Sequence, residues 1–382
     1  MSLPTIRGHG EVLHRLSRAA AGGTLAQSIL LYGPAGVGKE RIGLWLAQCL
    51  VCESPSPDGP CGACQPCRLV NRLEHPDVHW FFPLPRPEGA SADKLRDKLE
   101  DLRAAELVLR RADAGHVPSY DRAPAHFLAA VQRIHQLASV RPSMGRRKVF
   151  VVGDAELMVP QESSPEAANA FLKLLEEPPD DTTVIVTSSQ PGALLPTIRS
   201  RVLGIRVGPV ATEDVRAYLV EELGTPPEEA EAIARVSRGA IGRALRLRGE
   251  GADEGALRKA RATGRELLIA ALSRGPVPRL AAANAQKPVG GRGSFGDDLD
   301  ALGEWLRDLL AVAAGAEDAV ADPEARQLLQ RAVTRKGIHP LGVTAALGRV
   351  AEAQTWAQGN VNPQLIVAEL LRGIQADLEE RR

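Results

Sequence analysis

The chain has 382 residues, enough for roughly two to four domains and a sizeable core. Lys and Arg total 47, as do Asp and Glu, and aromatic residues are only 3%, so neither a global basic charge nor a base-stacking surface predicts direct nucleic-acid binding. The first residues form no apolar leader and no apolar run is long enough to span a membrane, so we expect a cytoplasmic protein with reduced thiols and no membrane partner.

A glycine-rich segment follows the first predicted strand. Residues 5–25 have an approximately helical apolar period, 29–32 form an apolar run, and a helix-like stretch ends near Val51. Between strand and helix lies Gly33-Pro34-Ala35-Gly36-Val37-Gly38-Lys39. Glycines let backbone N–H groups approach an anion, the helix start adds positive potential and Lys39 adds a charge. This order predicts a phosphate-binding loop, and the alternative is a tight strand–helix turn.

The residue after Lys39 departs from the phosphate-loop pattern. That position ordinarily holds Ser or Thr, whose hydroxyl binds magnesium, but here it is Glu40. A carboxylate cannot replace a neutral hydroxyl and repels a triphosphate. The loop can therefore keep its shape without supporting ATP hydrolysis, and binding of ATP with Mg²⁺ stays in doubt.

Four cysteines follow the loop helix with the spacing C-x8-C-x2-C-x2-C: Cys52, Cys61, Cys64 and Cys67. Paired C-x2-C steps bring thiolates to the distances of a tetrahedral ion, so the pattern predicts a structural zinc site without an open position. The alternatives are disulfides, which a reducing compartment disfavours, and buried thiols, which the Pro/Gly-rich setting disfavours. Cys49 is expected to be a buried helix residue. We assign His75 and His79, in a predicted strand at 75–82, a structural role.

Residues 83–124 have the composition of an insertion. Three prolines open it, and a charged helix is predicted at about 92–111, with Leu95, Leu99, Leu102 and Leu109 along one stripe. We expect a solvated helix resting on the domain.

The next segments predict the second half of a nucleotide-type site. An amphipathic helix at 127–138 precedes an apolar strand that ends at Asp154, a position suited to orient magnesium. In ATPases a catalytic Glu comes next, whereas this chain has Ala155, so the base that activates water is missing. Glu156 is displaced by one residue, and one step along a strand reverses the side a residue faces.

The remaining elements complete the domain plan. A helix at 169–177 and a buried strand at 184–189 give alternating strands and helices, which favour a parallel sheet covered on both faces. Short helices are predicted over 210–248, the first with an N-cap at Thr212. Residues 255–382 are predicted to be almost entirely helical, with a glycine-rich break at 290–296.

Together these features resemble the bacterial clamp-loader AAA+ family. The resemblance covers residues 5 to about 248 and is carried by the phosphate loop, the four-cysteine insert, the 169–179 helix and Thr197-Ile198-Arg199-Ser200-Arg201. Beyond 255 the main similarity is the segment 360–363. The resemblance implies an α/β AAA+ P-loop domain at 1–208, with a zinc module at 49–70 and the insertion at 83–124. It further implies a small helical lid at 209–250 and an all-helical collar at 255–382 that oligomerises.

The resemblance also implies roles for single residues. Ser200-Arg201 resembles a Ser-Arg-Cys motif whose arginine reaches a neighbouring subunit's ATP, although Val202 replaces the cysteine; the alternative for Arg201 is a surface salt bridge. Ser188 or Ser189 falls at the sensor-1 position. Arg243 falls at sensor 2, or is an ordinary helix arginine. Residues 161–165 and 83–124 exceed the family pattern.

Glu40 and Ala155 favour a subunit of this family that does not hydrolyse ATP over the hydrolysing gamma/tau type, which remains the alternative. Such a subunit would join gamma/tau and delta in a hetero-pentameric ring that loads the sliding clamp on primed DNA. It would offer Arg201 to the next ATP site, with the collar making most subunit contacts. A third reading is a free-standing zinc-containing ATP-binding regulator.

Overall fold

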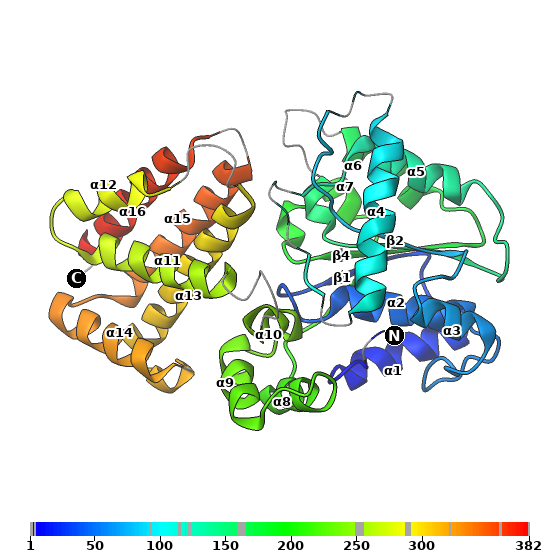
Figure 1. Cartoon of the computed structure of the whole chain (residues 1–382), viewed down its shortest axis with the longest axis horizontal. Coiled ribbons are helices and arrows are strands. Elements are labelled where there is room, and N and C mark those ends of the chain that lie inside the picture. The colour runs from blue at the N-terminus through cyan, green and yellow to red at the C-terminus, as the bar shows by residue number, and fades with distance from the viewer. Residues whose placement is uncertain are drawn as a thin grey trace. The chain divides into compact units, whose positions relative to one another are not determined.

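A computed structural model describes residues 3, 5–89, 91, 94–113, 116–118, 120, 122, 124–158, 166–248, 256–286, 292–320, 322–358 and 361–380. The chain divides into two compact units (Figure 1). The first comprises residues 1–118 and 124–245, and the second comprises 119–123 and 246–382.

One parallel sheet of five strands, in the order β2-β3-β4-β1-β5, organises the first unit. Ile29 of β1 aligns with Ile185 of β4 on one side and with Leu203 of β5 on the other. The three inner strands are almost wholly buried and have apolar centres, as expected for a parallel sheet covered on both faces. The strands are β1 (Ser28–Tyr32), β2 (Val78–Phe81), β3 (Lys148–Val152), β4 (Thr182–Ser188) and β5 (Leu203–Arg206).

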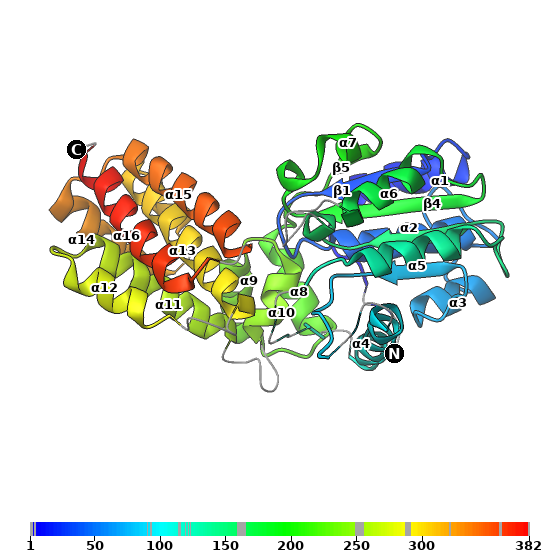
Figure 2. The same cartoon turned by 90° about the horizontal axis from the view of Figure 1, so that it is seen from above.

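Helices cover both faces of this sheet, as Figures 1 and 2 show. Residues alternate between the two layers: Ile29 and Leu31 of β1 pack with the loop helix α2, while Leu30 packs with α5 and α6. One face is covered by α1 (Gly10–Ala21), α2 (Lys39–Val51) and α3 (Gln65–Asn71). The other is covered by α5 (Leu128–Ala138), α6 (Glu166–Glu176) and α7 (Pro196–Arg199), with short 3-10 turns η1 (Ala155–Met158) and η2 (Pro191–Ala193).

The inserted helix α4 (Leu95–Ala112) lies beside the β2 edge of the sheet, where Figure 2 shows it end-on. Its inner face is charged: Arg103 stacks on Phe81 with 4.7 Å from its guanidinium carbon to the ring centroid, and Arg110 covers the Trp80 ring at 4.3 Å. Arg110 also pairs with the buried carboxylate of Glu106. The helix thus shields the edge strand through these cation–π contacts as well as through the buried Leu99.

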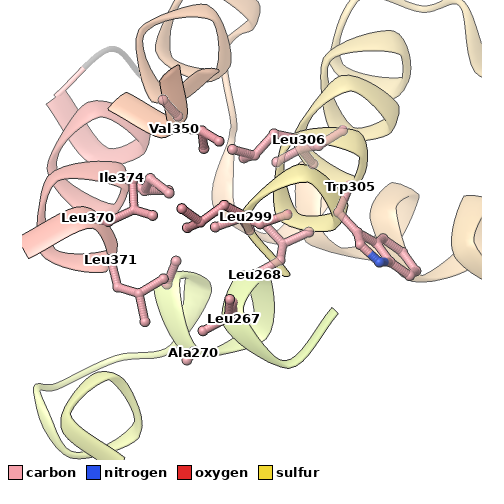
Figure 3. Close-up of a cluster of buried hydrophobic side chains, with 14 of the residues drawn as sticks. Leu267, Leu268, Ala270, Leu299, Trp305, Leu306, Val350, Leu370, Leu371 and Ile374 are labelled. Carbon is pink, nitrogen blue, oxygen red and sulfur yellow. The ribbon is translucent and has the colours of Figure 1, made fainter. Parts of the chain in front are cut away.

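Three short helices, α8 (Thr212–Glu221), α9 (Pro227–Ser237) and α10 (Ile241–Arg248), follow the sheet. The second unit contains α11 (Ala256–Leu272), α12 (Val277–Asn284), α13 (Arg292–Ala313), η3 (Glu317–Ala319), α14 (Pro323–Lys336), α15 (Pro340–Gln358) and α16 (Pro363–Glu380). Figure 3 shows its core, where Leu268 of α11, Leu299 and Leu306 of α13, and Leu370 of α16 meet. The indole nitrogen of Trp305 donates to the Arg261 carbonyl oxygen at 3.1 Å, which satisfies its one polar group.

The structure corrects three expectations about the helices. The N-cap of α8 is Ala211, without a side-chain bond, and Thr212 is the first helical residue. Of the α4 stripe, Leu99 is buried, but Leu102 and Leu109 are 36% and 50% exposed, because Arg103 and Arg110 occupy part of the inner face. Residues 292–296 of the predicted break are helical, while 290 and 291 lie outside the described residues, as does the insertion at 161–165. Strand β5 was not predicted.

Among the residues that the structure describes, no helix combines the length and the apolar character required to cross a membrane.

Replacing Phe171 with Ala should lower the free energy of unfolding by about 3–5 kcal/mol, because this α6 side chain is fully buried beneath the sheet. Denaturant unfolding measures the loss. The exposed Lys173 on the same helix is the matched control, and Lys173→Ala should stay within about 0.5 kcal/mol of the parent. A loss below about 1 kcal/mol for Phe171→Ala would contradict the assigned core.

Candidate functional site

The predicted phosphate loop lies at the carboxyl end of β1, and α2 begins directly after its last glycine, Gly38. Gly33 has φ 156°, and a Cβ there would meet the Val207 carbonyl oxygen at 1.9 Å, so no larger residue fits. The Gly33 N–H donates to the Ser188 carbonyl oxygen at 3.2 Å, which ties the loop to β4. The backbone therefore forms the expected strand–loop–helix turn.

Lys39 is directed into the protein. Its ammonium donates to the carbonyl oxygens of Gly33 at 3.0 Å and Pro34 at 2.9 Å, and to Ser189 Oγ at 2.9 Å. Burial lowers the pKa of Lys39, and the nearby carboxylates of Asp154, Glu156 and Glu40 partly oppose that shift. All three ammonium hydrogens thus have protein acceptors.

Glu40 is also engaged by the protein. Its Oε2 accepts a hydrogen bond from the Trp80 indole at 2.7 Å, and its carboxylate lies against Gly153, the residue after β3. A hydroxyl at this position would be too short to make the same bond. The side chain is therefore drawn toward the β2 edge of the sheet, where Arg110 covers Trp80.

Asp154 and Glu156 follow β3 in a conformation that the strand argument missed. Asp154 has φ 44°, and a 3-10 turn begins at Ala155, so strand alternation ends before Glu156. The Glu156 carboxylate enters the site, where its Oε1 accepts from the Ser189 N–H at 2.8 Å. Burial, followed by the charge of Asp154, raises the pKa of Glu156. The expectation that Glu156 would face the opposite side is therefore wrong.

The two sensor-1 candidates differ. Ser189 Oγ takes the Lys39 ammonium, whereas Ser188 is fully buried and its Oγ accepts from the Gln190 N–H at 3.1 Å. The Ser189 hydroxyl therefore contacts Lys39, while the Ser188 side chain hydrogen-bonds Glu156.

Helix α10 contacts the loop directly. The Gly242 N–H, in α10, donates to the Gly36 carbonyl oxygen at 2.8 Å, and a Cβ on Gly242 would meet Gly36 Cα at 2.9 Å. This close approach brings Arg243 beside the loop, as its assignment to sensor 2 requires. His9, the residue before α1, also contacts the loop, with its Nε2 2.9 Å from the Val37 carbonyl oxygen.

Arg201 lies away from the loop, ahead of the amino end of β5. Its Nη2 is 2.7 Å from Glu176 Oε1, and its Nη1 donates to the Thr197 carbonyl oxygen at 2.9 Å. The Arg201 and Glu176 side chains are 35% and 44% exposed. Exposed pairs of this kind contribute roughly 0–1 kcal/mol, so Arg201 can change partner at little cost.

The four predicted cysteines come together: the Sγ atoms of Cys52, Cys61, Cys64 and Cys67 lie within 4.8 Å of one another. The distances Cys61–Cys67 and Cys52–Cys64 are both 4.0 Å, close to the value of about 3.8 Å set by tetrahedral bonds of about 2.3 Å. The N–H groups of Cys64 and Ala63 lower the pKa of Cys61 to about 6, which favours its thiolate. These cysteines are close enough to share one metal ion. Cys49 is buried in α2, as expected.

The structure thus unites Lys39, Glu40, Asp154 and Ser189 around the loop, and it keeps Arg201 and the cysteines apart from them. Sequence reasoning missed Trp80 and Gly242, which are remote from the loop along the chain. The Trp80 contact could not be read from any motif, but a glycine at the start of α10 was a signal of close approach.

The sequence of this chain is similar to those of known proteins. A family model described as DNA polymerase III, delta subunit, matches residues 8–211. The chain is 34% identical over 231 residues to subunit delta-prime of DNA polymerase III from Pseudomonas aeruginosa, a match covering 60% of this chain and 58% of that relative. It is 27% identical over 245 residues to subunit tau from Escherichia coli, covering 63% of this chain and 31% of that relative.

Among solved structures, a DNA polymerase III gamma subunit-related protein of Thermotoga maritima aligns with 97% of this chain and 99% of its own, at 18% identity and a TM-score of 0.36. That score is too low to establish a shared fold. The sequence match to the Pseudomonas relative spans about half of that protein.

Replacing Glu40 with Thr should restore the magnesium hydroxyl without restoring turnover, because Ala155 still supplies no carboxylate and the Trp80 indole loses its acceptor. Phosphate release by the purified variant should match that of the double variant Lys39→Ala/Glu40→Thr. Brisk hydrolysis by Glu40→Thr that disappears in the double variant would contradict this account of the defect.

Proposed function

Because the chain belongs to the DNA polymerase III delta subunit family, we propose that it serves as a delta-prime-type clamp-loader subunit that does not hydrolyse ATP. The observation that supports this proposal is that the phosphate loop lacks two of the groups used in ATP hydrolysis. Glu40, which replaces the magnesium-binding hydroxyl, is held by Trp80, and Ala155 occupies the position of the water-activating carboxylate.

The loop in this proposal is structural. For Mg-ATP to bind, Lys39 would have to leave Gly33, Pro34 and Ser189, while the Glu40 carboxylate stayed near the phosphates. Both changes cost free energy, so ATP with Mg²⁺ is disfavoured at this loop. Contacts such as Gly242 with Gly36 instead hold α10 on the loop without nucleotide, and the subunit can act as a rigid brace.

We assign Arg201 a role in the ATP site of a neighbouring subunit. An exposed guanidinium whose pairing with Glu176 is weak can be transferred to a developing phosphate charge, where it stabilises the transition state. The ring would contain gamma/tau and delta subunits and would place the sliding clamp on primed DNA. In this scheme the helices at 255–382 form the collar, and DNA is reached through the complex.

Zinc is the metal that best fits the four cysteines. Four sulfur ligands with tetrahedral spacing and no oxygen donor match a structural zinc site, and its ion would hold residues 52–67 against α2. The contact of Gly59 with the Trp45 ring would position this module beside that helix.

One observation favours a second candidate, an ATP-hydrolysing motor of the gamma/tau type. The Glu156 carboxylate is buried near Lys39, with a raised pKa, and could serve as the general base. Its hydrogen bond from the Ser189 N–H holds Oε1 at the end of β4, and this engagement favours the first candidate.

Replacing Arg201 with Ala should lower turnover at the ATP site that receives this arginine by roughly 10³-fold or more, which is the usual effect on kcat of losing an arginine finger. The measurement uses the complete clamp loader with its other ATP sites inactivated. Glu176→Ala is the control, since it removes only the intramolecular partner and should leave that rate within about threefold. An unchanged rate for Arg201→Ala in a fully assembled complex would remove the trans role.

Replacing Cys64 with Ser should remove zinc and loosen the segment 52–67, because three thiolates and a hydroxyl bind zinc far more weakly than four thiolates. Metal analysis of the purified protein and hydrogen exchange over this segment test it. Cys49→Ser is the matched control and should retain the metal. If metal analysis finds no zinc in the purified wild-type protein, the assignment is wrong.

A further inference from the structure

The four cysteines of the cluster differ in their exposure to solvent. Cys61 is exposed, Cys52 and Cys64 are partly exposed, and Cys67 is fully buried. A buried structural cysteine is inert toward dissolved reagents, whereas an exposed one can be attacked. Cys61 is therefore the cysteine of the cluster that a reagent in solution reaches most readily.

Cys61 also lies on a part of the chain that has room to move. It stands outside the helices and strands, and the next residue, Gly62, has φ 70°. A Cβ built on Gly62 would meet nothing within 4 Å beyond its chain neighbours, so this turn faces open space. The chain after Cys61 can therefore shift without displacing side chains of the core.

Cys67, by contrast, is fixed. It lies in α3, and its carbonyl oxygen accepts a hydrogen bond from the Gln48 side-chain amide at 3.0 Å. Val70, one turn further along α3, is 1% exposed and belongs to the core cluster that contains α2. These contacts hold α3 on α2, and they hold Cys67 with it.

The sulfur atoms of Cys61 and Cys67 are 4.0 Å apart. A disulfide bond has a length of about 2.05 Å, so the two atoms would have to approach by about 2 Å. The open turn at Cys61 can supply this movement while Cys67 stays in α3. The sulfur atoms of Cys52 and Cys64 are also 4.0 Å apart and form the other pair.

We propose that Cys61 is a site of reversible oxidation, at which a peroxide converts Cys61 and Cys67 into a disulfide and so empties the metal cluster. The inference rests on the proposed zinc site. It goes beyond that site because it assigns the cluster a reaction, an order in which its cysteines react, and the chemical class of the reagent.

The reaction consumes one peroxide for each disulfide. The Cys61 thiolate attacks one peroxide oxygen, so that an S–O bond forms, the O–O bond breaks, and the hydroxide that leaves takes up a proton. The Cys67 thiolate then attacks the Cys61 sulfur, an S–S bond forms, and a second hydroxide leaves and is protonated. The two sulfur atoms lose two electrons to the peroxide, which becomes two waters. Cys52 and Cys64 then remain as the only thiolates, too few for a closed four-sulfur site.

Loss of the metal should loosen the segment between the first and last cysteines. Residues 53–58 are all exposed. The segment contacts α1 through the Pro57 carbonyl oxygen, which accepts from the Ser17 hydroxyl, and it contacts α2 where Gly59 lies against the Trp45 ring. A segment with so few buried contacts opens at a low free-energy cost. Oxidation should therefore free residues 53–66 without unfolding the sheet.

The test treats the purified chain, with zinc bound, with limiting hydrogen peroxide. We expect about one zinc ion, followed with a chromophoric chelator, to be released for each first disulfide formed. Mass mapping should find Cys61 and Cys67 in that disulfide, and a thiol reductant with added zinc should restore the metal. A first disulfide that lacks Cys61 would overturn the inference, and one that joins Cys61 to Cys64 would overturn the role of Cys67.

Cys61→His tests the role of the exposed sulfur, because three cysteines and one histidine still form a structural zinc site. Release of zinc by peroxide should slow at least about tenfold in this variant. Cys52→His is the matched control: it has the same ligand types but keeps Cys61, and its release rate should stay within about threefold of wild type. Equal rates for Cys61→His and wild type would contradict the proposal. If Cys61→His binds no zinc, the disulfide map of the wild-type chain decides.

Hydrogen exchange measures the structural consequence. After oxidation the amides of residues 53–66 should exchange at least about tenfold faster, while those of β1 and β4 keep their protection. Release of zinc with unchanged exchange would show that the metal does not hold this segment.

The outcomes separate this inference from the proposed function. If the wild-type chain contains zinc and keeps it in peroxide, the oxidation site is overturned and the zinc assignment stands. If the wild-type chain contains no zinc, the zinc assignment and this inference both fall. The proposed clamp-loader role is unaffected by either result, because Arg201→Ala tests it separately.

Discussion

All five strands of the sheet run in one direction, and the placement of the functional groups depends on that constraint. Carboxyl ends of parallel strands meet at one edge, so the phosphate loop after β1, Asp154 after β3 and Ser189 after β4 gather there. Amino ends meet at the opposite edge, where Arg201 precedes β5. The phosphate loop and the exposed Arg201 guanidinium therefore lie at opposite edges of the sheet.

The edge that carries the phosphate loop keeps its shape, but its charged side chains are bonded to other groups of the protein. Lys39 is satisfied by Gly33, Pro34 and Ser189, and Glu40 by Trp80. These contacts substitute protein acceptors and donors for phosphate oxygens and magnesium. The side chains of the loop edge therefore have partners within the protein itself. Helix α4 contributes by holding Trp80 under Arg110.

Much of this was predictable from local pattern. The apolar runs of β1 and β4, the amphipathic α5 and the cysteine spacing each fix a structure by themselves, and the resemblance to the clamp-loader family is confirmed by the comparisons. Strand β5 was missed because its four residues include Gly204 and stay largely exposed. Glu156 was misplaced because the left-handed Asp154 ends strand geometry, and the Trp80–Glu40 bond joins residues that only the folded chain brings together.

The most direct test is the steady-state ATPase rate of the purified chain alone, with magnesium, compared with its Lys39→Ala variant. We expect both proteins to release phosphate at the same background rate, because Glu40 replaces the magnesium-binding hydroxyl and Ala155 replaces the water-activating carboxylate. Vigorous turnover by the isolated chain that is abolished in Lys39→Ala would contradict it and would identify a working motor.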